Sequence, residues 1–191
     1  MNIGAAPSQR DGPFNVEVSM AFDIGNLLQQ YLGGASNAPA GREQDDFDQV
    51  AQNAPRPAIA QGMSEALRSD QTPPFPQMVS QLFDKSDANE RAGMLNQLLG
   101  GLGPGVLSSI AGGTLGGLFR GNEAPAAITP EQAATMSPEQ VREIAEKAEQ
   151  DNPSIIDRMG DFYAEHPQLV KTIGGAALAI LLGKVAQGMQ R

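Results

Sequence analysis

The chain has 191 residues, a net charge of −9 and no cysteine. The missing cysteines exclude disulfides, thiolate zinc sites and cysteine nucleophiles, and the acidic balance argues against nucleic acid as a partner, because affinity for phosphate depends on Lys and Arg. Hydrophobic residues make up 40% of the chain but aromatic residues only 5%, so we expect short, loosely connected helical units instead of one large core.

The N-terminal part divides into three pieces. Residues 1–19 contain no apolar run of the kind found in a secretory signal, and we expect a disordered leader; a second interpretation is that Met20 is the true start. Residues 20–34 carry an apolar helical stripe and end at two glycines, which predicts an amphipathic helix. A linker over residues 35–45 follows. The members of the stripe are Ile24, Leu27, Leu28, Tyr31 and Leu32.

Residues 46–121 are expected to form a helical unit of short stripes separated by Pro and Gly. The clearest stripe recurs at the spacing of one helix face and consists of Phe75, Met78, Val79, Leu82 and Phe83. The unit ends in residues 92–119, which contain 28 residues without a charge and nine glycines. For this stretch we predict a helix end, a hinge at Pro104 and then a close-packing apolar helix, with a flexible glycine-rich loop as the alternative.

The C-terminal part repeats one kind of helix start. Thr129-Pro130-Glu131-Gln132 and Ser137-Pro138-Glu139-Gln140 each offer a capping hydroxyl, a proline in the first helical position and a Glu-Gln pair in the first turn. Residues 122–136 are expected to be a linker and residues 137–191 a unit of three helices, each opened by an X-Pro step. No strand pattern of similar length occurs, so the predicted fold class is all-α, with short helices joined by Pro and Gly breaks.

Three motifs invite a chemical interpretation, and each favours a structural role. His166 is the only histidine and precedes a proline at a helix start, which is typical of a cap. Asp45-Asp46-x-Asp48 lacks the glycine and the twelfth-position glutamate of a calcium loop and indicates a solvated acidic cap around Phe47. Gly101–Gly105 follows no strand and has no Gly-Lys-Ser sequence after it. We therefore predict no enzyme activity, no catalytic or metal-binding residue, no cofactor and no small-molecule substrate.

Small residues spaced by four are the one pattern that points to an interaction. Overlapping Gly-x-x-x-Gly spacings leave helix ridges bare, so another backbone can approach closely, and a second small-residue face occurs in the last helix. The predicted interaction residues are Gly112, Gly113, Gly116, Gly117, Gly121, Gly174, Gly175, Ile180 and Leu181. These faces favour self-association or contact with another helical protein, and the two faces are predicted to be partners.

Several segments resemble proteins known from bacteria. MAFDIGNLLQQYLGG, TPPFPQMVSQLF, LLGGLGPGVLSSIAGG and the run from Ser137 to Gln187 are together similar to uncharacterised proteobacterial proteins, and the Leu/Gly part resembles the YidB-type family. The resemblance implies a bacterial origin and no particular chemistry. In composition alone, the acidic, glycine-rich and cysteine-free chain is similar to harpins.

The leading hypothesis is a bacterial, cytoplasmic, non-enzymatic helical interaction or scaffold protein that self-associates through its glycine-rich faces. Residues 137–165 would then form an acidic, solvated arm. One alternative is a membrane-associated protein that inserts the apolar stretches 92–119 and 169–188, and another is a secreted harpin-like protein. The self-association hypothesis and the membrane alternative both use residues 92–119, which carry no charge.

Overall fold

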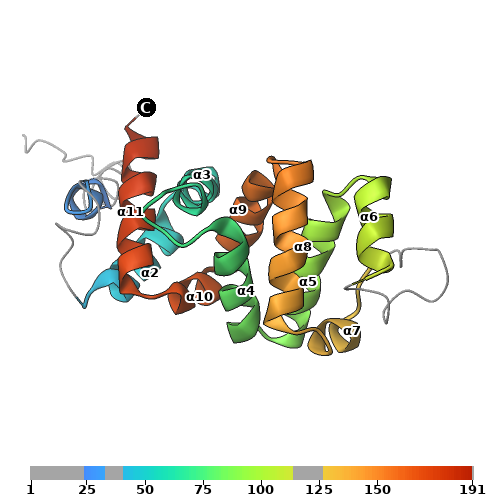
Figure 1. The fold of residues 1–191 in the computed structure, drawn as a ribbon. Coiled ribbons are helices and arrows are strands. Elements are labelled where there is room, and N and C mark those ends of the chain that lie inside the picture. The colour runs from blue at the N-terminus through green and yellow to red at the C-terminus, as the bar shows by residue number, and fades with distance from the viewer. Residues whose placement is uncertain (1–23, 33–40, 114–126, 191) are drawn as a thin grey trace, which may run out of the picture.

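The computed structural model describes residues 24–32, 41–113 and 127–190. Every regular element in these ranges is a helix and none is a strand, so the predicted all-α class is confirmed (Figure 1). A short helix at residues 24–29 comes first. It is followed by α2 (Glu43–Asn53), α3 (Arg56–Leu67), α4 (Phe75–Lys85), α5 (Ala88–Gly100), α6 (Pro104–Ala111), α7 (Pro130–Ala134), α8 (Pro138–Asp151), α9 (Ile155–Glu165), α10 (Pro167–Val170), the 3₁₀ turn η1 (Lys171–Ile173) and α11 (Gly175–Met189).

The helix starts are set by local side chains. Thr129 opens α7, where its Oγ1 accepts a hydrogen bond from the Gln132 backbone N–H at 3.3 Å, while the Thr129 backbone N–H donates to Gln132 Oε1 at 3.0 Å. Ser137 and Gln140 make the same reciprocal pair at the start of α8. Both motifs are capping boxes with proline in the first turn, as the sequence predicts.

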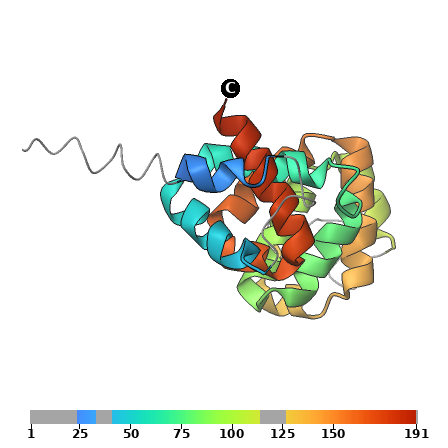
Figure 2. The same cartoon turned by 90° about the vertical axis from the view of Figure 1, so that its left-hand side faces the viewer.

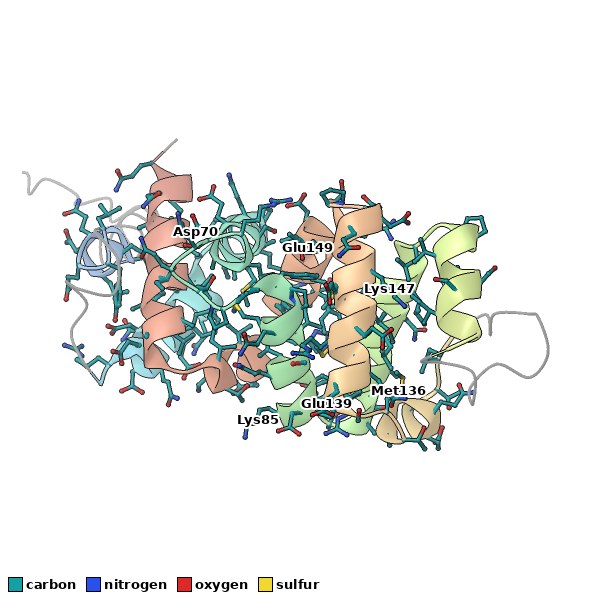
Figure 3. The ribbon with its side chains drawn as sticks, viewed as in Figure 1. Asp70, Lys85, Met136, Glu139, Lys147 and Glu149 are labelled. Atoms are coloured by element: carbon teal, nitrogen blue, oxygen red, sulfur yellow. The ribbon has the colours of Figure 1, made fainter. Side chains whose placement is uncertain are left out.

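The apolar stripes form the core. All five members of the α4 stripe are buried, and so are Ile155, Ile156, Met159, Phe162 and Tyr163 of α9. Helix α8 buries Val141 and Ile144, whereas its charged side chains, among them Glu139, Lys147 and Glu149, project from the helix (Figure 3). Periodicity therefore identified the inward face of each of these helices.

The two halves of the chain are interleaved. Helix α3 packs against α9 and α11, α4 packs against α8, and α5 packs against α7, α8 and α9, so one continuous apolar cluster joins residues from both halves. The expectation of loosely connected units, with residues 137–165 as a solvated arm, differs from this arrangement. The physical reason is that a short helix with one apolar face must bury it against a mate, and these helices find their mates in the other half.

The C-terminal run is divided. In place of one helix after His166, the structure has α10, the turn η1 and then α11, with Gly174 between them at φ +95°. Glycine populates this region without the Cβ penalty of other residues, so Gly174 lets the chain change direction. No helix in the described ranges combines the length and the apolar character needed to cross a bilayer.

The predicted N-terminal helix is described over residues 24–32. Its stripe is confirmed: Ile24, Leu28 and Tyr31 are buried, and Leu27 and Leu32 pack partly buried against the core. Residues 1–19 and Met20 lie outside the described residues. The segment lies beside α11, at the end of the molecule opposite α6 (Figures 1 and 2).

Candidate functional site

The first predicted glycine face begins where α6 ends. Gly112 is the C-cap of α6, in a right-handed conformation with φ −74°, and Gly113 follows in a turn, with its N–H donating to the Ile110 carbonyl at 3.1 Å. Both glycines are exposed, and an added Cβ would meet only backbone of their own helix end within 4 Å. Gly116, Gly117 and Gly121 lie outside the described residues. The described part of this face is therefore the exposed end of a helix.

The second predicted face is used inside the chain only in part, because Gly174 is exposed and an added Cβ there would meet no atom within 4 Å. Gly174 stands between η1 and α11, and a Cβ at Gly175 would lie 3.3 Å from the Glu43 carboxylate. Ile180 is 6% exposed and Leu181 is fully buried. Helices α6 and α11 lie at opposite ends of the molecule (Figure 1), so within one chain the described parts of the two predicted faces do not meet.

Close helix contacts do depend on glycine, but at other positions. Five glycines stand where a Cβ would come within 3.0 Å of another element or turn: Gly62 against Val185, Gly93 against Phe162, Gly101 against Ile155, Gly160 against Ala60 and Ser64, and Gly183 against the Tyr31 carbonyl. Sequence reasoning missed them because nothing near each glycine in the sequence indicates which element lies opposite it. A signal was present in Gly62, Gly160 and Gly183, each of which lies on or beside the apolar stripe of its helix.

Helix α6 carries buried and partly buried apolar side chains. Ile110 is buried, while Val106 and Leu107 are half-buried at its flank. The Gly103 N–H at the start of α6 donates to the Asp151 carboxylate at 2.9 Å, and the Asn152 side chain donates to the Gly101 carbonyl at 3.3 Å. The first bond fixes the start of α6 at the end of α8, and the second fixes the end of α5 there. Gly112 and Gly113 stand at the other end of α6.

A cleft of about 360 Å³ lies between α3 and α9. It is lined by Pro57, Ala60, Gln61, Ser64, Glu65, Arg68, Asp157 and Asp161. Two Arg68 N–H groups donate to the Asp157 carboxylate at 2.7 and 2.9 Å, and this hydrogen bonding lowers the pKa of Asp157 and raises the pKa of Arg68. The pair is about half exposed and therefore contributes little stability. Three carboxylates facing one guanidinium give the cleft a negative balance.

His166 is not among the residues that line this cleft. It ends α9 and precedes α10, its Nδ1–H donates to the Phe162 carbonyl at 2.9 Å, and its ring stacks on Phe162 at 4.3 Å. The carbonyl can only accept, so this nitrogen carries the proton. His166 therefore caps the end of α9, and its side chain makes no cap hydrogen bond at the start of α10, where the sequence predicts one.

The three aspartates of the acidic motif have separate environments. Asp46 is buried at 2% exposure and accepts the Tyr31 hydroxyl at 2.5 Å, whereas Asp48 accepts Lys171 Nζ at 2.7 Å and Asp45 is exposed. The prediction of a solvated cap is wrong for Asp46, because a fully buried Tyr31 covers it. No group of three metal-binding side chains occurs in residues 24–32, 41–113 and 127–190.

Two buried oxygen atoms have no hydrogen-bond partner within the described part of the chain, Asp46 Oδ1 and the Tyr163 hydroxyl. Arg42 Nη2 lies 3.8 Å from Asp46 Oδ1, which is close enough for charge attraction but too long for a hydrogen bond. Burial, and then the hydrogen bond to Asp46, raise the pKa of Tyr31; burial alone raises the pKa of Tyr163. Both phenols therefore stay protonated at neutral pH.

Comparison with protein-family models, with curated proteins and with solved structures gives no match for this chain. The likeness of its Leu/Gly segment to the YidB-type family stays a prediction. Any function must therefore be argued from the geometry alone.

Proposed function

We propose that this chain is a non-enzymatic helical interaction protein that self-associates through the end of the molecule formed by α6 and the glycines after it. The observation that carries the proposal is the open glycine terminus at Gly112 and Gly113, next to half-buried Val106 and Leu107. A backbone without side chains permits close approach of a second helix. The adjacent apolar side chains would supply the burial that stabilises the contact.

Charge favours a second copy as the partner. The molecule carries −9 overall, yet residues 92–119 contain no charge. Two copies that meet through this end keep their acidic surfaces apart, so electrostatic repulsion opposes the contact least there. An oppositely charged partner would instead be drawn to the acidic faces elsewhere on the molecule.

The proposal is tested by sedimentation velocity from 1 to 100 μM. The wild-type chain is expected to form dimers or larger assemblies within this range. The double variant Gly112→Glu, Gly113→Glu places two like charges in the contact and is expected to stay monomeric.

The matched control is Gln49→Glu, Gln52→Glu, which adds the same two charges on exposed positions of α2, at the far end of the molecule (Figure 1). It should associate like the wild type. A wild-type chain that remains monomeric at 100 μM, or equal dissociation of both double variants, would overturn the proposal.

A further inference from the structure

The start of α6 has no capping side chain of its own. Gly103 is the N-cap and carries no side chain, Pro104 in the first helical position has no N–H, and the third helical residue is Val106. Neither partner of a capping box is therefore present. A helix of eight residues has little stability of its own in water, so α6 depends on groups from other elements.

Helix α8 supplies the bond that α6 cannot make for itself. The Gly103 backbone N–H donates to Asp151 Oδ2 at 2.9 Å, across 48 positions of the sequence. In α5, α7 and α8 the N-cap N–H donates instead to the third residue of the same helix, which is Glu90 at 2.9 Å, Gln132 at 3.0 Å and Gln140 at 3.0 Å. Asp151 therefore takes, from a different helix, the place of the glutamate or glutamine in a capping box.

The position of Asp151 benefits α6 and not α8. Asp151 is the last residue of α8, where the negative end of the helix dipole disfavours a carboxylate. The same carboxylate lies at the start of α6, where the positive end of the dipole favours it. The electrostatic interaction that stabilises this side chain is consequently the one with α6.

Gly103 is the point at which α6 can move relative to α5. The end of α5 is held firmly, because the Asn152 side chain donates to the Gly101 carbonyl at 3.3 Å and an added Cβ at Gly101 would lie 2.7 Å from Ile155 Cδ1. Among the described residues, a Cβ at Gly103 would meet only the Asp151 carboxylate, at 3.5 Å. The Asp151 bond thus acts at the junction between a fixed helix end and α6.

We infer that Asp151 is the positioning residue for α6, and that α6 opens locally, pivoting at Gly103, when this carboxylate is lost. The other capped helices carry both halves of their capping boxes, whereas the start of α6 is conditional on α8. The meaning of this for self-association rests on the proposed function, because α6 carries the proposed contact. The local effect on α6 does not, since it is a property of the single chain.

The test compares three full-length variants with their parent, all in the background Gly112→Glu, Gly113→Glu, so that association at α6 does not contribute. Asp151→Ala removes the acceptor. Asp151→Asn keeps an oxygen that can accept the Gly103 N–H. The matched control, Glu149→Ala, removes a carboxylate from the same last turn of α8, where its side chain projects from the helix (Figure 3), and it relieves the α8 dipole equally.

Hydrogen–deuterium exchange of residues 107–111 gives the result. In Asp151→Ala these amides are expected to exchange about fivefold faster than in the parent, the factor expected for the loss of one hydrogen bond of ordinary strength, while amides of α3 and α9 keep their rates. Glu149→Ala and Asp151→Asn should both remain close to the parent.

Three results would overturn the inference: equal exchange in Asp151→Ala and Glu149→Ala, exchange in Asp151→Asn as fast as in Asp151→Ala, or acceleration of α3 and α9 together with α6. The first would show that the bond does not hold α6, the second that its acceptor is not what matters, and the third that Asp151 stabilises the whole molecule. The measurement is made on single chains, so a failure of the proposed self-association leaves its outcome readable.

Discussion

Two glycines within buried helix faces and three glycines at the ends of α6 and α11 have different surroundings in this molecule. Gly160 and Gly183 stand on buried faces of α9 and α11 and receive atoms of neighbouring elements, whereas Gly112, Gly113 and Gly174 occur in pairs or runs and lie at helix ends, where an added Cβ meets no other element. A glycine within an apolar stripe permits close packing. A glycine run ends the helix, because each glycine costs about 1 kcal/mol of helix stability relative to alanine.

The largest effect is expected at Gly160. An alanine there would place a Cβ 2.8 Å from the Ala60 carbonyl oxygen and closer still to the Ser64 hydroxyl, so α3 and α9 must separate. Overpacking of this kind costs about 1–3 kcal/mol, and we expect Gly160→Ala to lower the free energy of unfolding in urea by about 2 kcal/mol. Unchanged or increased stability would contradict the close-packing role.

A smaller effect is expected from Tyr31→Phe. The variant keeps the aromatic ring but leaves the buried Asp46 carboxylate without its hydrogen-bond donor, which costs about 1–2 kcal/mol. Because the Tyr31 hydroxyl holds residues 24–32 on Asp46 of α2, we expect the loss as faster proteolysis of this segment, with little change in the urea midpoint of the core. Equal destabilisation of the whole molecule would contradict this local effect.

The Arg68–Asp157 ion pair joins α3 and α9, the same two helices that meet at Gly160. It therefore allows the contribution of charge to this helix contact to be measured apart from that of packing. Hydrogen bonding to Arg68 lowers the pKa of Asp157, so its stabilisation is present above the unfolded pKa of about 4 and is lost as pH falls below that value. Since the pair is half exposed, we expect less than about 1 kcal/mol. Denaturation of Arg68→Gln between pH 7 and pH 2.5 should show a shallower acid dependence than the wild type; an identical slope would assign the contact to packing alone.

The smallest effect is expected at Gly113. Its φ is not in the left-handed region, and a Cβ would meet only the Ser109 carbonyl at 3.6 Å. Gly113→Ala should therefore change the free energy of unfolding by less than about 0.5 kcal/mol in the same urea titration that measures Gly160→Ala. A loss comparable with that of Gly160→Ala would remove the distinction between the two kinds of glycine.

Local patterns were sufficient for much of the fold. The capping boxes at Thr129 and Ser137 and the stripe beginning at Phe75 depend on residues a few positions apart, so the sequence displays them directly. The Glu143–Lys147 ion pair, four residues apart on α8 and 2.9 Å long, is of the same local kind. Short-range geometry is fixed by helix periodicity and needs no knowledge of the partner elements.

Contacts between residues far apart in the chain could not be predicted from the sequence in the same way. Nothing near Asp46 in the sequence shows that Tyr31 will cover it, and nothing near Gly160 indicates that Ala60 lies opposite. Each contact depends on which apolar faces meet across the chain, and several helices of similar length offer equivalent faces. The break at Gly174 is a related case. The residues after it continue the apolar period, so the sequence does not display the turn that requires the positive φ.

The central claim, self-association through the α6 end, is tested most directly by hydrogen–deuterium exchange at several protein concentrations. Between 1 and 100 μM, amides of residues 104–113 are expected to exchange more slowly as concentration rises, because the contact excludes water from them, while amides of α2 should exchange at a constant rate. If exchange in residues 104–113 is independent of concentration, the α6 end is not where copies of this chain meet.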